Sequence, residues 1–487
     1  MADRSSSGTP FGGFHIGCAC HHPGVARMTN RMNADLSRRG FLACVGGTVT
    51  ALGLPDMARA QVAPKPAATP PQVLLSNVRL FDGVSLTLRD GVSVLVEGAR
   101  IAAIDATRAT PPAGARVIDC GGRVLMPGMI DAHWHTMMAA LPLPVLLTAD
   151  IGYLHLAAST EAERTLQRGF TTVRDAGGPS FALKRAIDEG MISGPRIFPS
   201  GAMISQTAGH GDFRFRYEVP RTDNSLTRSE AAGASTIADS PDEVRRRTRE
   251  QLMLGASQIK LMAGGGAASL YDPLDAIQYR PEELRAAVEA AEDWGTYVMT
   301  HVYMPLGIRR AVAAGVRCIE HGQLTDEDTV RTMVDAGVYW SLQPFLAESA
   351  GGTNQDPVVL KKLAQVREGT DTAYRLAIKH KARIGWGSDI LFSPGDTDRQ
   401  VTLLTDMRRW FTPAQTLRQI TSENAAILAL SGARAPYDGK LGVIEKGAFA
   451  DLLVVDGDPT QDLAVLGDPA RNLRVIMKDG RIHKNAL

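Results

Sequence analysis

The feature that most constrains the fold is a regular alternation between residues 128 and 430. Apolar segments of strand length are separated there by helical stretches and by turn-forming residues. Such alternation predicts βα units and a parallel sheet. Eight βα units close into a (β/α)8 TIM barrel, whose active site lies at the C-terminal ends of its strands. The expected strands are 128–132, 171–175, 196–201, 257–262, 297–301, 317–321, 339–343 and 384–389.

Short alternating strands also occur on both sides of this middle part. The N-terminal set covers 73–78, 92–97, 101–104 and 117–119, and the C-terminal set covers 450–456 and 475–481. Segments rich in strands thus lie on both sides of a middle part that alternates strands with helices. This arrangement predicts one small domain assembled from both termini. We therefore expect an α/β fold in which a β-sandwich, built from 72–127 plus 431–487, accompanies a barrel over 128–430. The polar, strand-poor stretch 206–240 is expected to be a loop over the barrel mouth that acts as a lid or substrate clamp.

The charge balance excludes two classes of partner. The chain of 487 residues has 53 Lys and Arg residues against 52 Asp and Glu residues, so its formal net charge is +1. Proteins that bind nucleic acid or an anionic membrane surface usually have an excess of basic residues. We therefore expect neither of these partners. Hydrophobic residues make up 44% of the chain, which is enough to form a sizeable core.

The first sixty residues have the layout of an export signal. Arg38-Arg39 with Phe41 precede a short apolar run over 43–54, and Ala58-Arg59-Ala60 offers a cleavage site. This layout resembles a twin-arginine secretory signal, and the apolar run is too short to span a bilayer. We expect cleavage after Ala60, a linker over 61–71, and a periplasmic or secreted protein whose transport partner is the twin-arginine translocation machinery.

The translation start is open, because Met28 and Met32 are alternative first residues. Residues 1–31 are then a mis-assigned start, and their cysteines and histidines have no role in the mature protein. Cleavage after Ala60 leaves Cys120 and Cys318. Two cysteines give no disulfide framework, although the expected destination is oxidising.

Potential metal ligands follow several of the expected barrel strands. His133 and His135 come directly after the first strand, and alternate side chains of an extended segment point the same way. Four further residues fall at later strand ends: Lys260 at the fourth, His301 at the fifth, His321 at the sixth and Asp389 at the eighth. A barrel directs all of these side chains to one point, so the sequence predicts a metal site at its mouth.

These residues lie in motifs that resemble the binuclear metal-dependent amidohydrolase superfamily. The motifs are Pro127-Gly-Met-Ile-Asp-Ala-His-Trp-His135, Ile259-Lys260, Thr300-His301, Ile319-Glu-His-Gly322, Gly387-Ser-Asp389 and the closing segment 442–452. Lys260, the segment 205–212 and His301-Val-Tyr303 are most similar to the imidazolonepropionase-like branch. That branch includes Xaa-Pro dipeptidases (prolidase-like enzymes) and ochratoxin-hydrolysing amidases. The resemblance also implies a homo-oligomer.

The resemblance implies two divalent metal ions. In it, His133, His135 and Asp389 hold one ion, and His301 and His321 hold the other. An ammonium group cannot bind a metal, so Lys260 acts only if it is neutral or modified. The family solution is a carbamate formed with CO2, whose two oxygens bridge the ions. Zinc is the leading metal, and this ligand set also suits Mn, Co or Fe.

The same resemblance assigns roles in catalysis. Two neighbouring metals lower the pKa of a bridging water, so that hydroxide is available to attack an amide carbonyl at neutral pH. Asp389 is suited to take the proton of the water and to pass it to the leaving nitrogen. His210, in a Thr-Ala-Gly-His segment where relatives have Thr-Gly-Gly-His, helps to bind or polarise the substrate. Tyr303 and Arg214 are candidate contacts for a substrate carboxylate.

We therefore expect an exported binuclear hydrolase that cleaves a C–N bond in an Xaa-Pro dipeptide or an N-acyl amino acid. Two alternatives stay open. One is a cyclic-amide hydrolase of the imidazolonepropionase type, although that reaction belongs to cytoplasmic catabolism. The other is a non-catalytic periplasmic binding protein on the same barrel.

Overall fold

All eight expected barrel strands are present in the computed structural model, which describes residues 71–105, 111–219, 225–269, 271–346 and 356–487. Residues 1–70, with the export signal and the linker, lie outside the described residues. β6–β7–β8 form one parallel sheet, and β11 to β15 follow one another in a second. The bounds are β6 (Met129–Trp134), β7 (Phe170–Asp175), β8 (Arg196–Phe198), β11 (Ile259–Met262), β12 (Val298–Val302), β13 (Cys318–His321), β14 (Tyr339–Leu342) and β15 (Arg383–Trp386). The expected α/β fold is confirmed.

Hydrogen bonds close the barrel where the two sheets meet. Between β8 and β11, the Ser257 N–H donates to the Pro199 carbonyl at 2.7 Å. Between β15 and β6, Asn424 bridges the strands with its side chain: Nδ2 donates to the carbonyls of Ile130 (2.7 Å) and Trp386 (2.8 Å), and Oδ1 accepts from the Trp386 N–H at 3.0 Å. An amide side chain thus replaces part of the backbone ladder at this seam.

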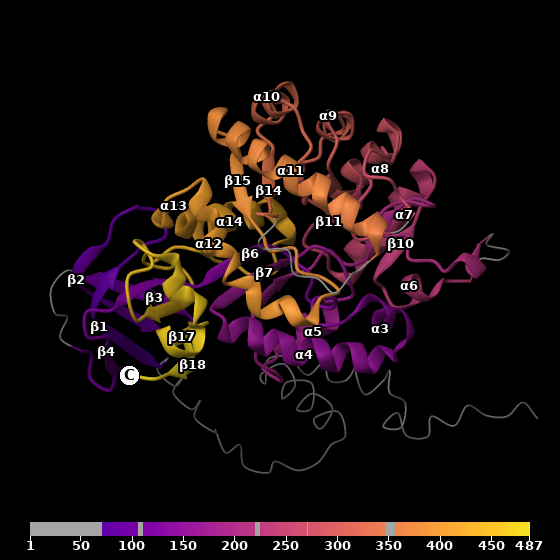
Figure 1. Cartoon of the computed structure of the whole chain (residues 1–487). Coiled ribbons are helices and arrows are strands. Elements are labelled where there is room, and N and C mark those ends of the chain that lie inside the picture. Colours follow the sequence, from indigo (N-terminus) through magenta and orange to yellow (C-terminus); the bar gives the residue numbers. More distant parts are fainter. Residues whose placement is uncertain (1–70, 106–110, 220–224, 270, 347–355) are drawn as a thin grey trace, which may run out of the picture. The chain divides into compact units, whose positions relative to one another are not determined.

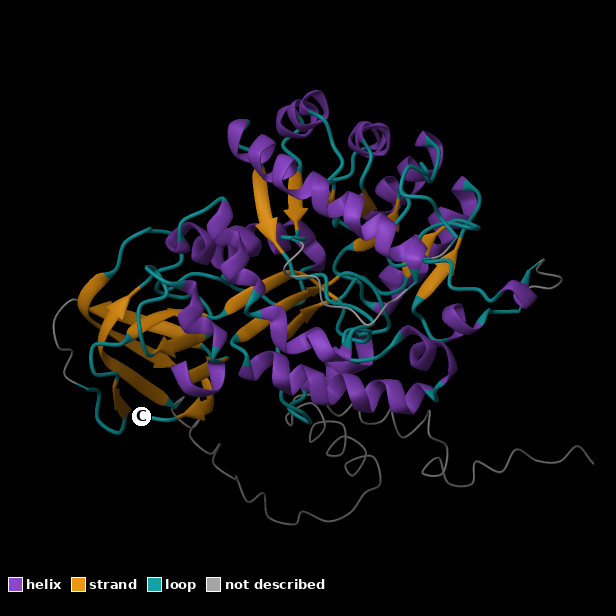
Figure 2. Ribbon diagram, viewed as in Figure 1, coloured by secondary structure: helices purple, strands orange, loops and turns teal. Residues whose placement is uncertain are grey.

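Helices surround the barrel strands (Figures 1 and 2). Several begin with proline directly after a capping residue, as in Ser240-Pro241, Asp356-Pro357 and Thr412-Pro413, whose side chains accept from backbone N–H groups of the first turn. The helices are α3 (Leu143–Thr148), α4 (Ile151–Gln167), α5 (Phe181–Asp188), α6 (Arg228–Ala231), α7 (Pro241–Leu254), α8 (Pro281–Glu292), α9 (Pro305–Ala314), α10 (Glu327–Asp335), α11 (Pro357–Lys379), α12 (Leu403–Asp406), α13 (Pro413–Arg418), α14 (Asn424–Leu428) and α15 (Pro469–Asn472).

The stretch 206–240, expected to be a loop, is not a loop throughout. The short strand β9 (Met203–Ser205) comes directly before this stretch, and β10 (Ser235–Ile237) lies within it. The two strands pair in parallel and extend the second sheet beyond β11. Helix α6 lies between them, and residues 220–224 are outside the described part. Strands of three residues are too short to give a periodic signal, so the sequence pattern missed them.

Strands from both ends of the chain form one mixed sheet, drawn in indigo and yellow in Figure 1. Its order is β18-β17-β16-β5-β1-β2-β3, with β4 paired to β1. The bounds are β1 (Gln72–Leu80), β2 (Arg89–Glu97), β3 (Arg100–Asp105), β4 (Arg116–Asp119), β5 (Val124–Pro127), β16 (Leu452–Val455), β17 (Leu473–Lys478) and β18 (Arg481–Asn485). β5 and β18 were not expected from the sequence.

β5 joins the two ends of the chain, because it pairs with β1 on one side and with β16 on the other. Ile101 in β3 exchanges backbone hydrogen bonds with Gly447 and Ala448, so this edge strand is covered by the segment before β16. The aliphatic side chains of Leu75, Val94, Leu125 and Val454 are fully buried between these strands. The composite β unit therefore has a core of its own.

Among the described helices, none combines the length and the apolar character needed to cross a bilayer. Cys120 and Cys318 are both buried and free.

Replacement of Asn424 by alanine is expected to destabilise the barrel seam. The substitution leaves two buried carbonyls and one buried N–H without their partner, at about 1–3 kcal/mol for each such group, so we expect a loss of about 3 kcal/mol or more in the free energy of unfolding. Urea denaturation measures this change. Asn485→Ala, at the exposed end of β18, is the control and should change the free energy of unfolding by less than about 0.5 kcal/mol. Equal stability of the two variants would contradict the role of Asn424.

Candidate metal centre

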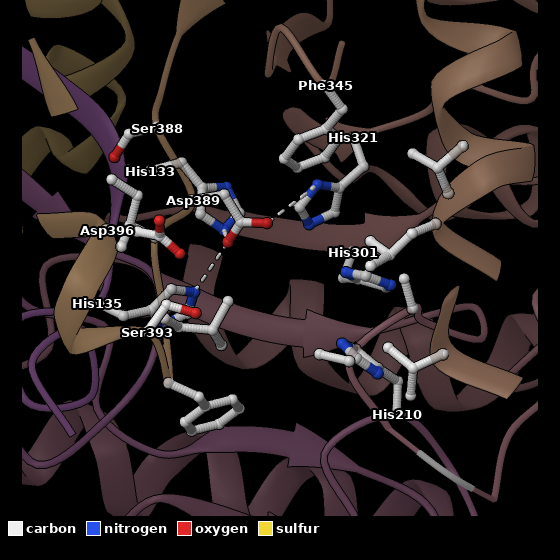
Figure 3. Close-up of a pocket in the computed structure, with 18 of the residues that line it drawn as sticks. His133, His135, His210, His301, His321, Phe345, Ser388, Asp389, Ser393 and Asp396 are labelled. Carbon is white, nitrogen blue, oxygen red and sulfur yellow. Dashed lines mark ion pairs between the residues drawn. The ribbon is translucent and has the colours of Figure 1, made fainter. Parts of the chain in front are cut away.

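A cavity of about 630 Å³ opens at the C-terminal ends of the barrel strands. Its polar floor is formed by the predicted metal ligands, and its walls are largely apolar. The floor residues are His133, His135, Lys260, His301, His321 and Asp389, and the wall residues include Leu143, Met262, Phe345, Leu363, Val366 and Phe392. Figure 3 shows the four floor histidines and Asp389 gathered around one space. The structure thus brings together the six side chains that the sequence placed at separate strand ends.

His133, His135 and Asp389 form a tight group. Nε2 of each histidine lies 3.2 Å from Oδ1 of Asp389, and the ligand atoms of the three residues lie within 4.8 Å of one another. The Asp389 N–H donates to the His133 carbonyl at 2.8 Å, and the backbone of Asp389 has φ +52°. This left-handed conformation is tolerated by Asp. It directs the carboxylate back toward the two imidazoles.

Lys260, His301 and His321 complete the floor. Nζ of Lys260 lies 3.5 Å from Nε2 of His133. The ring centroid of His321 lies 4.8 Å from that of His133 and 4.4 Å from that of His301. All of these side chains are buried. Lys260 thus lies beside the first group of ligands.

The chemistry of the donors fits metal ions. In each floor histidine one ring nitrogen faces a protein oxygen outside the ligand group that only accepts. With the proton held on that nitrogen, the other nitrogen would offer its lone pair to a metal ion. The four contacts are His133 Nδ1 to Glu320 Oε2 (2.7 Å), His135 Nδ1 to the Gly177 carbonyl (3.4 Å), His301 Nε2 to the Gly265 carbonyl (3.1 Å) and His321 Nδ1 to Gln343 Oε1 (2.8 Å).

Glu320 and Arg174 form a charged pair below the metal ligands that sequence reasoning missed. The Arg174 guanidinium donates to both Glu320 oxygens at 2.7 and 2.8 Å, and both residues are fully buried. Although burial acts to raise it, Arg174 and His133 hold the pKa of Glu320 well below its ordinary range. Glu320 is therefore an anion that accepts from His133. The only sign of the pair in the sequence was one charged residue inside each of two buried strands, Arg174 in β7 and Glu320 in β13.

Burial and mutual contact place these groups in the forms that bind metals. Burial, together with neighbouring cations, lowers the pKa of His301 and of His321 well below the ordinary value, so both are neutral at pH 7. Although burial acts to raise it, the facing imidazoles hold the pKa of Asp389 well below its usual range. Burial lowers the pKa of Lys260 to about 8. A substantial fraction of its amine is therefore neutral near physiological pH.

His210 and Tyr303 line the same cavity. The His210 ring stacks on His301 with 4.1 Å between centroids, and the Tyr303 ring lies 5.1 Å from His301 and 5.3 Å from His321. Ala208, which stands where relatives have glycine, adopts φ +60°. The loop thus keeps a left-handed turn despite the added methyl group, at a cost of about 1–2 kcal/mol.

Arg214 is not among the residues that line the cavity. Asp212 holds its guanidinium with hydrogen bonds of 2.8 and 2.5 Å, so its charge is neutralised locally. The arginines on the cavity wall are Arg367 from α11 and Arg399, and Arg399 pairs with Asp396 at 3.3 Å. No acidic side chain of the described residues pairs with Arg367. The structure thus places Arg367, and not the predicted Arg214, on the cavity wall.

Comparison with known proteins agrees with the geometry. The model of the amidohydrolase family matches residues 124–483. The chain belongs to the amidohydrolase family. This amidohydrolase is 31% identical to the ochratoxinase of Aspergillus niger over 384 residues, which cover 74% of the chain and 76% of that relative.

Two solved structures are also similar to this amidohydrolase. A prolidase in complex with N-methylphosphonate-L-proline matches with a TM-score of 0.77 and 33% identity, over 85% of the chain and all of the prolidase. A Xaa-Pro dipeptidase with methionine bound in its active site matches with a TM-score of 0.73 and 28% identity, over 85% of the chain and all of that protein. The resemblance inferred from the motifs is confirmed: this is a metal-dependent, prolidase-like amidohydrolase that acts on C–N bonds.

Replacement of Glu320 by glutamine is expected to weaken metal binding. The change removes the anion that accepts from His133, and loss of such a partner behind a metal ligand usually lowers metal affinity about 10- to 100-fold. Competition with a chromophoric chelator measures the affinity. The control is Glu368→Gln, an exposed position on α11, which should bind metal like the wild type. Unchanged affinity in the Glu320 variant would show that the pair has only a structural role.

Proposed function

We propose that this amidohydrolase binds two divalent metal ions and hydrolyses the C–N bond of an Xaa-Pro dipeptide or an N-acyl amino acid. The observation that carries the proposal is the convergence of four histidines, Lys260 and Asp389 on the floor of one cavity. When bound, two divalent ions supply an activated water nucleophile and polarise the carbonyl oxygen. Zinc is the leading metal, and Mn, Co or Fe suit the same donors.

Asp389 is the proton carrier in this proposal. Its carboxylate lies on the cavity floor, 3.2 Å from Nε2 of both His133 and His135, and it is ionised. An ionised carboxylate at this place can accept a proton from water and return it to the nitrogen that leaves, which must be protonated to depart. The ring of His210 stacks on that of His301 and lines the cavity, so it can contact a substrate bound above the floor.

The cavity wall supports this substrate class. Beside Tyr303 the wall is apolar, with Phe345, Leu363 and Val366, and it ends at Arg367. A small substrate with an apolar body and a free carboxylate complements this wall, because the guanidinium offers the carboxylate charge-assisted hydrogen bonds. The prolidase and the Xaa-Pro dipeptidase noted above support this class through the proline analogue and the methionine bound to them.

A substrate panel tests the proposal. Zinc-loaded protein is assayed on Xaa-Pro dipeptides, N-acyl amino acids, their C-terminal carboxamides and imidazolonepropionate. We expect turnover of the free acids. Turnover of imidazolonepropionate alone would favour cyclic-amide hydrolysis, and binding of the panel without any turnover would favour a binding protein. No turnover by protein that carries two metal ions would overturn the proposed function.

Arg367→Gln refines the same panel. Loss of a charged hydrogen bond of about 1.5–3 kcal/mol lowers kcat/KM about 10- to 100-fold for the free acids and leaves the carboxamides nearly unchanged. Arg375→Gln, an exposed arginine of α11 paired with Asp371, is the matched control. An equal loss on acids and carboxamides would show that Arg367 does not recognise the carboxylate.

We propose that Lys260 carries a carbamate, which would give the floor a further anionic ligand for the metal ions. Only the neutral amine attacks CO2, and its pKa of about 8 means that the neutral fraction rises with pH, reaches about one half near pH 8 and levels off about one unit higher. At a fixed concentration of dissolved CO2, uptake of two metals by metal-free protein should therefore become faster between pH 6.5 and 8.5. Metal per chain, measured by mass spectrometry, follows the uptake. A Lys260→Met variant that still binds two ions would contradict this role.

We propose that the protein is exported as a folded chain by the twin-arginine route. The support is the layout of Arg38-Arg39, Phe41 and Ala58-Arg59-Ala60 in the sequence. Cell fractionation should find a mature protein that begins at Gln61 in the periplasmic or secreted fraction, and lysines in place of both arginines should retain the precursor inside. Retention of the unaltered protein would contradict export. Size-exclusion chromatography of the mature protein tests the homo-oligomer that the resemblance implies.

A further inference from the structure

His210 is held on three sides by residues that are distant in sequence. Its ring stacks on His301, as Figure 3 shows, and its Nδ1 lies 2.7 Å from Oγ of Ser269 and 3.4 Å from Oδ2 of Asp272. Gly266 packs directly against the ring, and a Cβ added there would overlap the imidazole. Ser269 and Asp272 belong to the loop that follows β11.

Asp272 sets the direction of the hydrogen bonds in this group. Its carboxylate is buried and accepts from the Gly266 N–H at 2.5 Å and from the Ser269 hydroxyl. Although burial acts to raise it, the contacts with His210, Ser269 and Gly266 hold the pKa of Asp272 below its ordinary value. The Ser269 hydroxyl has one hydrogen, which goes to this carboxylate. Its oxygen therefore faces His210 as an acceptor, and Nδ1 of His210 carries a proton.

Lys362 fixes the loop from the other side. This lysine lies on α11, is 8% exposed, and donates from Nζ to the carbonyls of Gly266 (3.1 Å), Ser269 (2.7 Å) and Asp272 (2.5 Å). One buried ammonium group thus holds the three loop residues that surround His210. The next turn of the same helix carries Leu363, Val366 and Arg367 on the cavity wall.

We infer that Asp272 and Ser269 are positioning residues that fix the tautomer and orientation of His210, and that Lys362 anchors their loop to α11. The inference rests on the proposed function, in which His210 contacts the substrate. With the proton held on Nδ1, Nε2 presents its lone pair to the cavity, and it has no partner among the described residues. The substrate therefore meets His210 as a hydrogen-bond acceptor in a fixed place. Removal of the carboxylate frees the ring to exchange tautomers, as in other carboxylate–histidine pairs of enzymes.

A double-mutant cycle tests the inference with the zinc-loaded full chain. Asp272→Asn has nearly the same shape and should lower kcat/KM about 10-fold or more, and Ser269→Ala and Lys362→Met should also lower it. Asp272→Asn should cause no further loss in a His210→Gln background, because it acts through His210. Asp275→Asn and Lys361→Met, at exposed neighbouring positions, are the matched controls. Unaltered metal content and melting temperature show that each variant is folded.

Nitrogen NMR of labelled histidine provides a readout that does not depend on turnover. Ring nitrogen shifts distinguish a protonated from an unprotonated nitrogen, and the His210 signal is the one that disappears in His210→Gln. We expect Nδ1 to be protonated in the wild type and this preference to be lost in Asp272→Asn. Protonation on Nε2 in the wild type, or a kinetic loss of equal size in the His210→Gln background, would overturn the inference. Absence of turnover on the whole panel with the expected NMR result would instead overturn the proposed function alone.

Discussion

The buried pair of Arg174 and Glu320 is the interaction on which the arrangement of the site depends. Two charges without water are stable only when every donor and acceptor is satisfied, and breaking such a pair usually costs about 3–5 kcal/mol. Here Arg174 also donates to the Ala132 carbonyl at 2.5 Å and to the Tyr297 hydroxyl at 3.1 Å. These partners come from β6, β13 and the residue before β12, so one guanidinium from β7 ties four parts of the barrel together. Nδ1 of His133 lies 2.7 Å from Oε2 of Glu320. The position of the first metal ligand is thus set by this charge as well as by strand geometry.

The sequence predicted the parts of the site that depend on the backbone alone. Strand periodicity located the barrel strands, and residues at strand ends converge in any barrel, so His133, His301 and Asp389 could be assigned without a structure. Glu320 and Arg174 could not, because their partners are set by packing between neighbouring strands. Arg214 and Arg367 show the same limit for loops and helices. Only the three-dimensional path of the chain shows that Asp212 neutralises Arg214 and that Arg367 reaches the cavity wall.

Helix α11 connects recognition and chemistry. Its apolar residues and Arg367 form one wall of the cavity, while Lys362 holds the loop whose residues surround His210. The floor is formed by strand ends, which vary little in position, and the wall is formed by a helix and loops, which can vary between relatives. A division of this kind lets one metal centre serve different small substrates, because changes on the wall leave the ligands undisturbed.

The seam closed by Asn424 also limits the order in which the chain can fold. The side chain of Asn424 bonds to Ile130, 294 positions earlier in the chain, and β5 finds one of its two partners only in β16. Neither the barrel nor the composite sheet can therefore be completed until almost the whole chain has been synthesised. Until then the early strands have unpaired edges and exposed apolar surface. Folding is therefore slow, and the incomplete chain is prone to aggregation. The strands near Ile130 and Leu125 therefore reach their native pairing only after Asn424 and β16 have been added to the chain.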